Sequence, residues 1–305
     1  MNPQKIALLT DSCADIPAEL CRQYDIFVLP LRLLFSDGEY LDGQTITADE
    51  VYERLPHEIP TTSLPAGQSV EQIFNQMIAA GYEKVLAVHL SAGLSGTYNL
   101  VRLMGEDCEA LEVRAFDSVS GSLGIGLTLI QAARMIEQGC TWEQLLQAVP
   151  QMLAGTKVFF CVDTLEYLQK GGRIGKITAV AGSLLQIKPI ITFAPTGELI
   201  NVAKGRGRKA ALDKLMALFA SPAPKIVPFW RRLWMAASRK KGMRCAISSC
   251  RPCRTVLRSS AVKSTAPSAL MSARICWVQV FRSFRTGEHC NMFRKNRLFF
   301  NGSVT

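Results

Sequence analysis

The 305-residue chain lacks any uninterrupted apolar run that approaches the ~18 residues needed for a membrane-spanning helix. Its first apolar stretch, Ile6–Leu9, is also too short for the hydrophobic region of a signal peptide. Apolar residues still make up 48% of the chain, which is enough for a sizeable core and excludes a disordered or collagen-like protein. We therefore expect a folded, cytoplasmic protein with one large domain or two smaller ones.

Histidine is scarce, with three residues in the whole chain, and its placement argues against a metal site. His89 lies inside an apolar segment typical of a buried strand, so we expect a core histidine. Cys250 and Cys253 have CxxC spacing, but no second pair follows at zinc-finger spacing. The remaining candidate ligands also lack the spacing of a zinc site: His57, Cys245, Cys276, His289 and Cys290. We expect neither a metal ion nor a cofactor.

Acidic residues are nearly missing from the last 80 residues. Residues 226–305 contain 16 of the 35 Lys and Arg but a single acid, Glu288. The net charge of +10 therefore divides into +15 for this tail and −5 for residues 1–225. Such different compositions need separate explanations.

In residues 1–225, apolar strand-like runs alternate with segments of helical period. The expected strands are Ile6–Leu9, Ile26–Leu34 (one strand, or two pieces around Pro30), Lys84–Leu90, Leu111–Phe116 and Val158–Val162. The expected helices run from Pro17 to Tyr24, from Thr47 to Leu55, and over Gly67–Ala80, Ser122–Ile136 and Thr141–Met152. This alternation favours an α/β domain with a largely parallel sheet.

Small polar residues follow several of these strands. They are Thr10-Asp11-Ser12, Ser91, Asp117-Ser118 and Asp163-Thr164. Each residue taken alone is best explained as a helix N-cap, whereas the four together favour one ligand site at the carboxyl edge of the sheet. One alternative is a phosphoryl-transfer enzyme in which Asp11, Asp117 and Asp163 bind Mg²⁺. The chain has no P-loop and no nucleophile arrangement, which argues against this alternative.

A second, smaller lobe is expected to begin at residue 165. Its first feature is a flexible basic loop, Gly171–Gly175. A strand over Ile187–Phe193, a turn at Pro195-Thr196-Gly197 and a returning strand over Glu198–Ala203 then predict a hairpin. A helix over Ala210–Ala220 follows.

Two hydroxyl-rich loops each come before an expected helix. The segment Ser91–Tyr98 contains two glycines, which allow a close approach of the backbone to a ligand, and its helix start favours an anion. The loop Thr61–Pro65 is the second, and an N-terminal cap is its simplest explanation.

Taken together, these motifs resemble the DegV family. The matching segments are Thr10–Pro17 (TDSCADIP), Thr62–Pro65 (TSLP), Leu90–Tyr98 (LSAGLSGTY), Asp117-Ser118, Asp163–Ile174 (DTLEYLQKGGRI) and Lys188–Ile190 (KPI). Their order and spacing cover residues 5 to about 220. The chain departs from the family pattern at Leu64, where Gln is usual.

The resemblance implies a two-lobe fatty-acid-binding protein rather than an enzyme. The acyl chain would lie in an apolar tunnel between the lobes, with its carboxylate held by the hydroxyls of Thr62 and Ser95. Some members present the fatty acid to a separate kinase, and the loop around Arg173 would then be a docking surface for that kinase. No cofactor is implied beyond the bound fatty acid. Apolar walls and a few polar groups at one end suit such a ligand.

We thus divide the chain into an N-terminal α/β lipid-binding domain over residues 1–164, the start of a second lobe over 165–225, and an atypical basic tail over 226–305. The tail lacks the late family segment similar to GAHxGPG. Reading degenerate codons for Ala266–Val278 in a shifted frame permits GAHVGPxLLG, so we hypothesise a frameshift near residues 220–235. The alternative is a nucleic-acid-binding arm, in which Arg side chains and aromatic rings contact a single strand.

Overall fold

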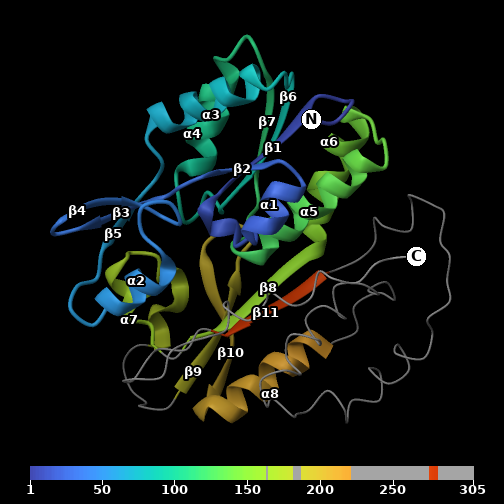
Figure 1. Cartoon of the computed structure of the whole chain (residues 1–305). Coiled ribbons are helices and arrows are strands. Elements are labelled where there is room, and N and C mark those ends of the chain that lie inside the picture. The colour runs from blue at the N-terminus through green and yellow to red at the C-terminus, as the bar shows by residue number, and fades with distance from the viewer. Residues whose placement is uncertain (163, 181–186, 221–274, 281–305) are drawn as a thin grey trace.

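The computed structural model describes residues 1–162, 164–180, 187–220 and 275–280. These residues form a two-lobe α/β fold (Figure 1). A four-stranded parallel sheet makes the first lobe, a second four-stranded sheet makes the other, and a small three-stranded sheet projects from the side. The expected fold class is confirmed.

The first sheet has the strand order β2-β1-β6-β7, and every pair in it is parallel. Its strands are β1 (Ile6–Asp11), β2 (Ile26–Leu29), β6 (Lys84–His89) and β7 (Glu112–Asp117). Both faces of the central strands are buried, which explains why β1 and β6 are almost continuously apolar. This was the signal that allowed the sheet to be predicted.

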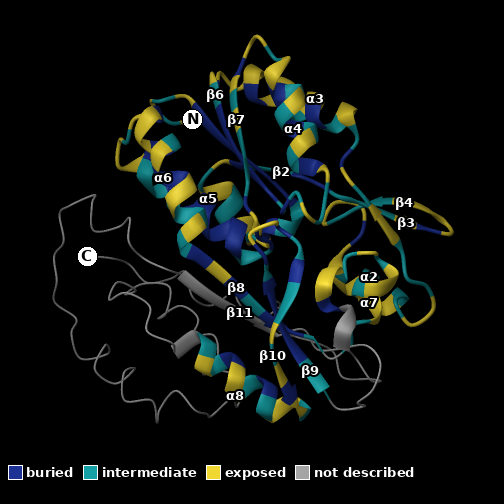
Figure 2. Ribbon diagram, turned by 180° about the vertical axis from the view of Figure 1, so that it is seen from behind, coloured by how far each residue is buried: buried dark blue, intermediate teal, exposed yellow. Residues whose placement is uncertain are grey.

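Helices cover both faces of this sheet, and alternate strand residues point to opposite cores. Ile6 and Leu8 of β1 pack on the side of α5 (Leu123–Glu137) and α6 (Trp142–Gly155). Ala7 and Leu9 pack on the side of α3 (Gly67–Ala79) and α4 (Thr97–Glu106). The short α1 (Ala18–Gln23) begins after Pro17, as expected. Figure 2 shows the buried strands between partly exposed helices.

The small sheet has the order β4-β3-β5 and is antiparallel. Its strands are β3 (Arg32–Phe35), β4 (Gly38–Leu41) and β5 (Thr61–Ser63), with α2 (Ala48–Arg54) inserted before β5. Pro30 separates β2 from β3, and the two strands enter different sheets, so the prediction of two pieces is the right one. The capping box at Thr47 is present.

The second sheet has the order β10-β9-β8-β11. Its strands are β8 (Thr156–Cys161), β9 (Ile187–Phe193), β10 (Leu199–Arg206) and β11 (Ile275–Val280). The predicted hairpin is the antiparallel pair of β9 and β10, followed by α8 (Gly207–Ala220). β8 precedes residue 165 yet belongs to this sheet, so the sheet begins earlier in the chain than the predicted boundary.

Two short helices, α7 (Glu166–Lys170) and η2 (Gly175–Val180), connect β8 to β9 around the basic loop. In the tail, β11 pairs with β8 in parallel, and the rest of residues 226–305 lies outside the described residues. The domain boundaries and the frameshift therefore stay predictions. Among the helices that the structure describes, none is both long enough and apolar enough to cross a membrane.

Candidate functional site

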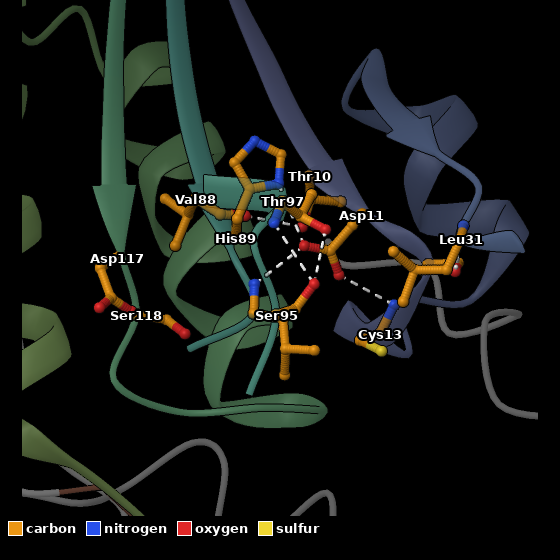
Figure 3. Close-up of polar contacts among 12 residues, drawn as sticks. Thr10, Asp11, Cys13, Leu31, Val88, His89, Ser95, Thr97, Asp117 and Ser118 are labelled. Atoms are coloured by element: carbon orange, nitrogen blue, oxygen red, sulfur yellow. Dashed lines mark hydrogen bonds and ion pairs between the residues drawn. The ribbon is translucent and has the colours of Figure 1, made fainter. Parts of the chain in front are cut away.

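Polar side chains gather where β1, β6 and β7 end, as the sequence predicts. Asp11, His89 and Asp117 are the last residues of these adjacent strands, and His89 is in register with Asp117. The close-up in Figure 3 shows these residues around the start of α4. The fourth predicted contributor follows β8, which lies in the other sheet, so the expected grouping on one sheet is wrong for it. Asp163 itself lies outside the described residues.

The Asp11 carboxylate connects three segments of backbone. Its Oδ1 accepts from the amide of Cys13 at 3.1 Å and caps the short helix η1 (Ser12–Ala14). Its Oδ2 accepts from the amide of Leu90 at 2.8 Å and lies 3.1 Å from Nδ1 of His89. Asp11 and His89 are fully buried, so the expectation that His89 is a core residue is confirmed. The N-cap interpretation of Asp11 is correct too.

Asp117 and Ser91 do not act as helix caps. Oδ1 of Asp117 accepts from the amides of Ala92 at 3.1 Å and Val119 at 2.8 Å. The Ser91 hydroxyl donates to the carbonyl of Gly197 at 2.8 Å, across to the β9–β10 turn. Both side chains therefore fix loops at the sheet edge.

These contacts oppose the magnesium alternative. Oδ1 and Oδ2 of Asp11, and Oδ1 of Asp117, already accept hydrogen bonds from the protein, and Asp11 is inaccessible to solvent. Within the residues that the structure describes, no three His, Cys, Asp or Glu side chains group as metal ligands. Structural roles account for both carboxylates.

Ser95 lies in the turn before α4 and is half-buried. Its Oγ accepts from the amide of Thr97 at 3.3 Å and lies 2.9 Å from the Thr97 hydroxyl, as Figure 3 shows. Gly96 is the N-cap residue and supplies no side-chain cap. Ser95 consequently presents a hydroxyl at the positive end of a helix dipole, where an anion is favoured.

Thr62 lies on β5, opposite Leu33 of β3, and is exposed. The expected loop is thus a short strand, and Thr62 caps no helix, since α3 follows Ala66 without a side-chain cap. Arg32 holds this segment by donating to the Leu64 carbonyl at 2.9 Å and to the Ser63 hydroxyl at 3.0 Å. Pairing with β3 is the tertiary contact that converts the segment into a strand.

The Thr62 strand and the Ser95 turn meet through Leu64. A Cβ placed on Gly96 would lie 3.8 Å from Cδ2 of Leu64, which is van der Waals distance. The segments that carry the two predicted hydroxyls, Thr62 and Ser95, are therefore neighbours in the fold. The family departure at Leu64 falls at the contact between these segments, with the Leu64 side chain 37% exposed.

The Arg173 side chain is hydrogen-bonded to the turn that contains Ser95. Its Nε donates to the carbonyl of Leu94 at 3.3 Å, and its Nη1 donates to the carbonyl of Gly171 at 2.6 Å. The side chain is half-buried. Arg173 thus connects the second lobe to the residue before Ser95.

The two lobes touch at a glycine pair that sequence reasoning did not single out. A Cβ on Gly93 would come within 2.5 Å of the backbone carbon of Gly197, a contact that real side chains do not make. Gly197 also has a φ of +84°, which favours glycine. Glycine at these two positions allows the Ser91 loop to lie against the β9–β10 turn. The sequence signal was the Pro195-Thr196-Gly197 turn, but its partner was not predictable.

Apolar side chains of both lobes pack together beside this junction. Val158, Phe160 and Ile191 of the second sheet join Leu127 of α5, with Leu94 packed against them. This cluster begins one residue from Ser95. An apolar region thus adjoins the hydroxyl-lined edge.

Cys13 adds no reactive thiol to this edge. Burial raises the pKa of the Cys13 thiol well above its usual value, and the negative charges of Asp11, Asp15 and Asp42 raise it further. The thiol stays protonated at neutral pH and is a poor nucleophile or metal ligand.

The fold and the site define a two-lobe α/β protein with a hydroxyl-lined edge between its lobes. The model of the DegV family, described as uncharacterised proteins, matches residues 5–227. A DegV domain-containing protein of Clostridium acetobutylicum is 42% identical over 215 residues, covering 70% of this chain and 77% of its own. A similar protein of Clostridium perfringens is 37% identical, covering 70% and 76%. This chain belongs to the DegV family.

Solved structures agree with this assignment. A DegV lipid-binding protein of Thermotoga maritima is 31% identical with a TM-score of 0.64, covering 72% of this chain and 78% of its own. A stearic-acid-binding protein of Eubacterium ventriosum is 32% identical with a TM-score of 0.63, covering 69% and 74%. DegV of Bacillus subtilis, a fatty-acid-binding protein, is 29% identical with a TM-score of 0.68, covering 79% and 89%. These three solved structures are described as lipid-binding or fatty-acid-binding proteins.

Proposed function

We propose that this chain binds a long-chain fatty acid between its lobes, with the carboxylate accepting hydrogen bonds from the hydroxyls of Thr62 and Ser95. The observation that carries the proposal is the meeting of the two hydroxyl-bearing segments at Leu64 and Gly96. One carboxylate has two oxygens and four acceptor positions, so hydroxyls from two neighbouring segments suit it.

Charge and polarity support this choice of ligand. The helix dipole of α4 favours an anion at Ser95, and the Arg173 guanidinium lies on the neighbouring Leu94 carbonyl. The apolar cluster of Leu127, Val158, Phe160 and Ile191 suits an acyl chain. Related proteins described as binding stearic or heptadecanoic acid support the same ligand class.

The bound acid is proposed to be presented to a separate fatty acid kinase, with the Arg173 loop as the docking surface. Lys170 and Lys176 flank this loop and are well exposed, although each also pairs with a glutamate. Arg173 itself lies against the Ser95 turn through its bond to the Leu94 carbonyl. A kinase that docks there would reach the carboxylate end of the ligand.

Lipid extraction from the purified chain, followed by mass spectrometry, tests the proposal. The expected result is one long-chain fatty acid per chain, retained through purification, and no acyl phosphate when ATP and Mg²⁺ are added to the chain alone. A chain that carries no fatty acid and takes up none, but turns over a phosphorylated substrate, would contradict it.

A further inference from the structure

We propose that Thr97 is a positioning residue that turns the Ser95 hydroxyl into a dedicated hydrogen-bond donor for the ligand. The proposal rests on the proposed binding of a carboxylate at Ser95. It concerns a residue that touches Ser95 but is itself fully buried and out of reach of the ligand.

The argument begins with the count of protons and lone pairs on Ser95. A serine hydroxyl has one proton to donate and two lone pairs that accept. A carboxylate can only accept, so it must receive the Ser95 proton. The two contacts from Thr97, its amide at 3.3 Å and its hydroxyl at 2.9 Å, then both have to donate to Ser95 Oγ.

The Thr97 hydroxyl has Ser95 as its single hydrogen-bond partner among the described residues. The side chain has no exposed surface, and in the described part of the chain its Oγ1 has no other hydrogen-bond partner. If the Thr97 hydroxyl accepted from Ser95 instead, the single Ser95 proton would be bonded to Thr97 and could not reach the ligand. Donation by Thr97 breaks no other hydrogen bond and leaves the Ser95 proton free to bond the ligand.

The geometry is fixed before the ligand arrives, because both contacts come from the first residue of α4. Pre-orientation of a donor avoids the entropy cost of ordering it on binding. Loss of the Thr97 hydroxyl should weaken fatty-acid affinity by about 3- to 10-fold, the effect of one neutral hydrogen bond.

The test measures the affinity for a long-chain fatty acid in a double-mutant cycle with thermal unfolding recorded in parallel. Thr97→Val should weaken binding in the wild-type background and have no further effect in Ser95→Ala, because its role acts through the Ser95 hydroxyl. Thr97→Ser should retain near-normal affinity. Thr156→Val, which removes a buried hydroxyl bonded to the Met152 carbonyl at the start of β8, is the matched control and should bind normally.

An unchanged affinity in Thr97→Val, or an equal loss in the Ser95→Ala background, would overturn the proposal. If the valine methyl group in place of the hydroxyl prevents folding, Thr97→Ala repeats the cycle without that methyl group. Failure of the wild-type chain to bind any fatty acid is a separate result, which would overturn the proposed function and this inference with it.

Discussion

Oδ2 of Asp11 and Nδ1 of His89 lie 3.1 Å apart, and neither side chain has any exposed surface. The Asp11 carboxylate also accepts from two backbone amides, so the Nδ1 atom of His89 carries the proton in this contact. Nε2 of His89 is buried and has no partner among the described residues. The pair connects the last residues of β1 and β6.

Removing the Asp11 carboxylate should lower the stability of the protein. Asp11→Ala leaves the amides of Cys13 and Leu90 and the His89 ring without their acceptor, and each buried group left unpaired costs about 1–3 kcal/mol. We expect a loss of about 3 kcal/mol or more in the free energy of unfolding, measured by urea denaturation. Asp107→Asn, at an exposed position after α4, is the control and should change stability little. A near-normal midpoint for Asp11→Ala would contradict this stabilising role.

The contact between the lobes should be sensitive to one methyl group. Gly93→Ala places a Cβ against the backbone of Gly197, so the Ser91 loop and the β9–β10 turn must separate. We expect a loss of about 1–3 kcal/mol in unfolding free energy together with weaker fatty-acid retention. Gly67→Ala, whose Cβ would meet only the Met104 side chain at 3.8 Å, should be tolerated. Equal stability of the two variants would show that the lobes do not depend on this contact.

An ion pair beside the small sheet should make the stability of the protein depend on pH. The Arg54 guanidinium, which bonds Asp37 at 2.6 Å, holds the pKa of that carboxyl below its ordinary value, and Tyr40 contributes in the same direction. A depressed folded-state pKa gives stability that is present above the unfolded-state pKa and lost as the pH falls through the folded-state value. NMR titration should give a lowered Asp37 pKa in the wild type and a higher one, closer to the ordinary value, in Arg54→Gln, where the Tyr40 contact remains. An identical Asp37 pKa in both chains would reject the pairing.

The basic tail carries a prediction at the level of the gene. The family match ends at residue 227, close to where the composition changes at residue 225. If a frameshift is the cause, the alternate reading frame over codons 215–280 should encode a segment similar to GAHxGPG and contain no stop codon. Resequencing of this region decides the question. Stop codons, or no such segment, would leave the basic tail as the true sequence.

Much of the first lobe was predictable because its signals are local. The apolar runs of β1 and β6, the capping box at Thr47 and the helical period of α3 each fix an element without distant partners. The strand β4 was missed, although the Asp37-Gly38 pair after β3 is a hairpin signal. Its four residues are exposed or half-buried and carry little apolar alternation.

The residues of the candidate site could be predicted from the sequence, but the tertiary contacts between them could not. Motif resemblance selected Thr62 and Ser95, and the small polar residues after strands selected Asp11 and Asp117. The pairing of β5 with β3 and the contact of Gly93 with Gly197 depend on segments far apart in the chain, which periodicity does not encode. For the same reason, the bond from Arg173 to Leu94 could not be foreseen.

The central claim is that the hydroxyls of Thr62 and Ser95 hold a fatty-acid carboxylate, and equilibrium binding of a long-chain fatty acid tests it most directly. Thr62→Ala and Ser95→Ala should each weaken affinity by about 10- to 100-fold, the effect of one hydrogen bond to a charged group. Thr61→Ala, on the opposite side of β5, is the control and should bind normally. Wild-type affinity in both Thr62→Ala and Ser95→Ala would contradict the account.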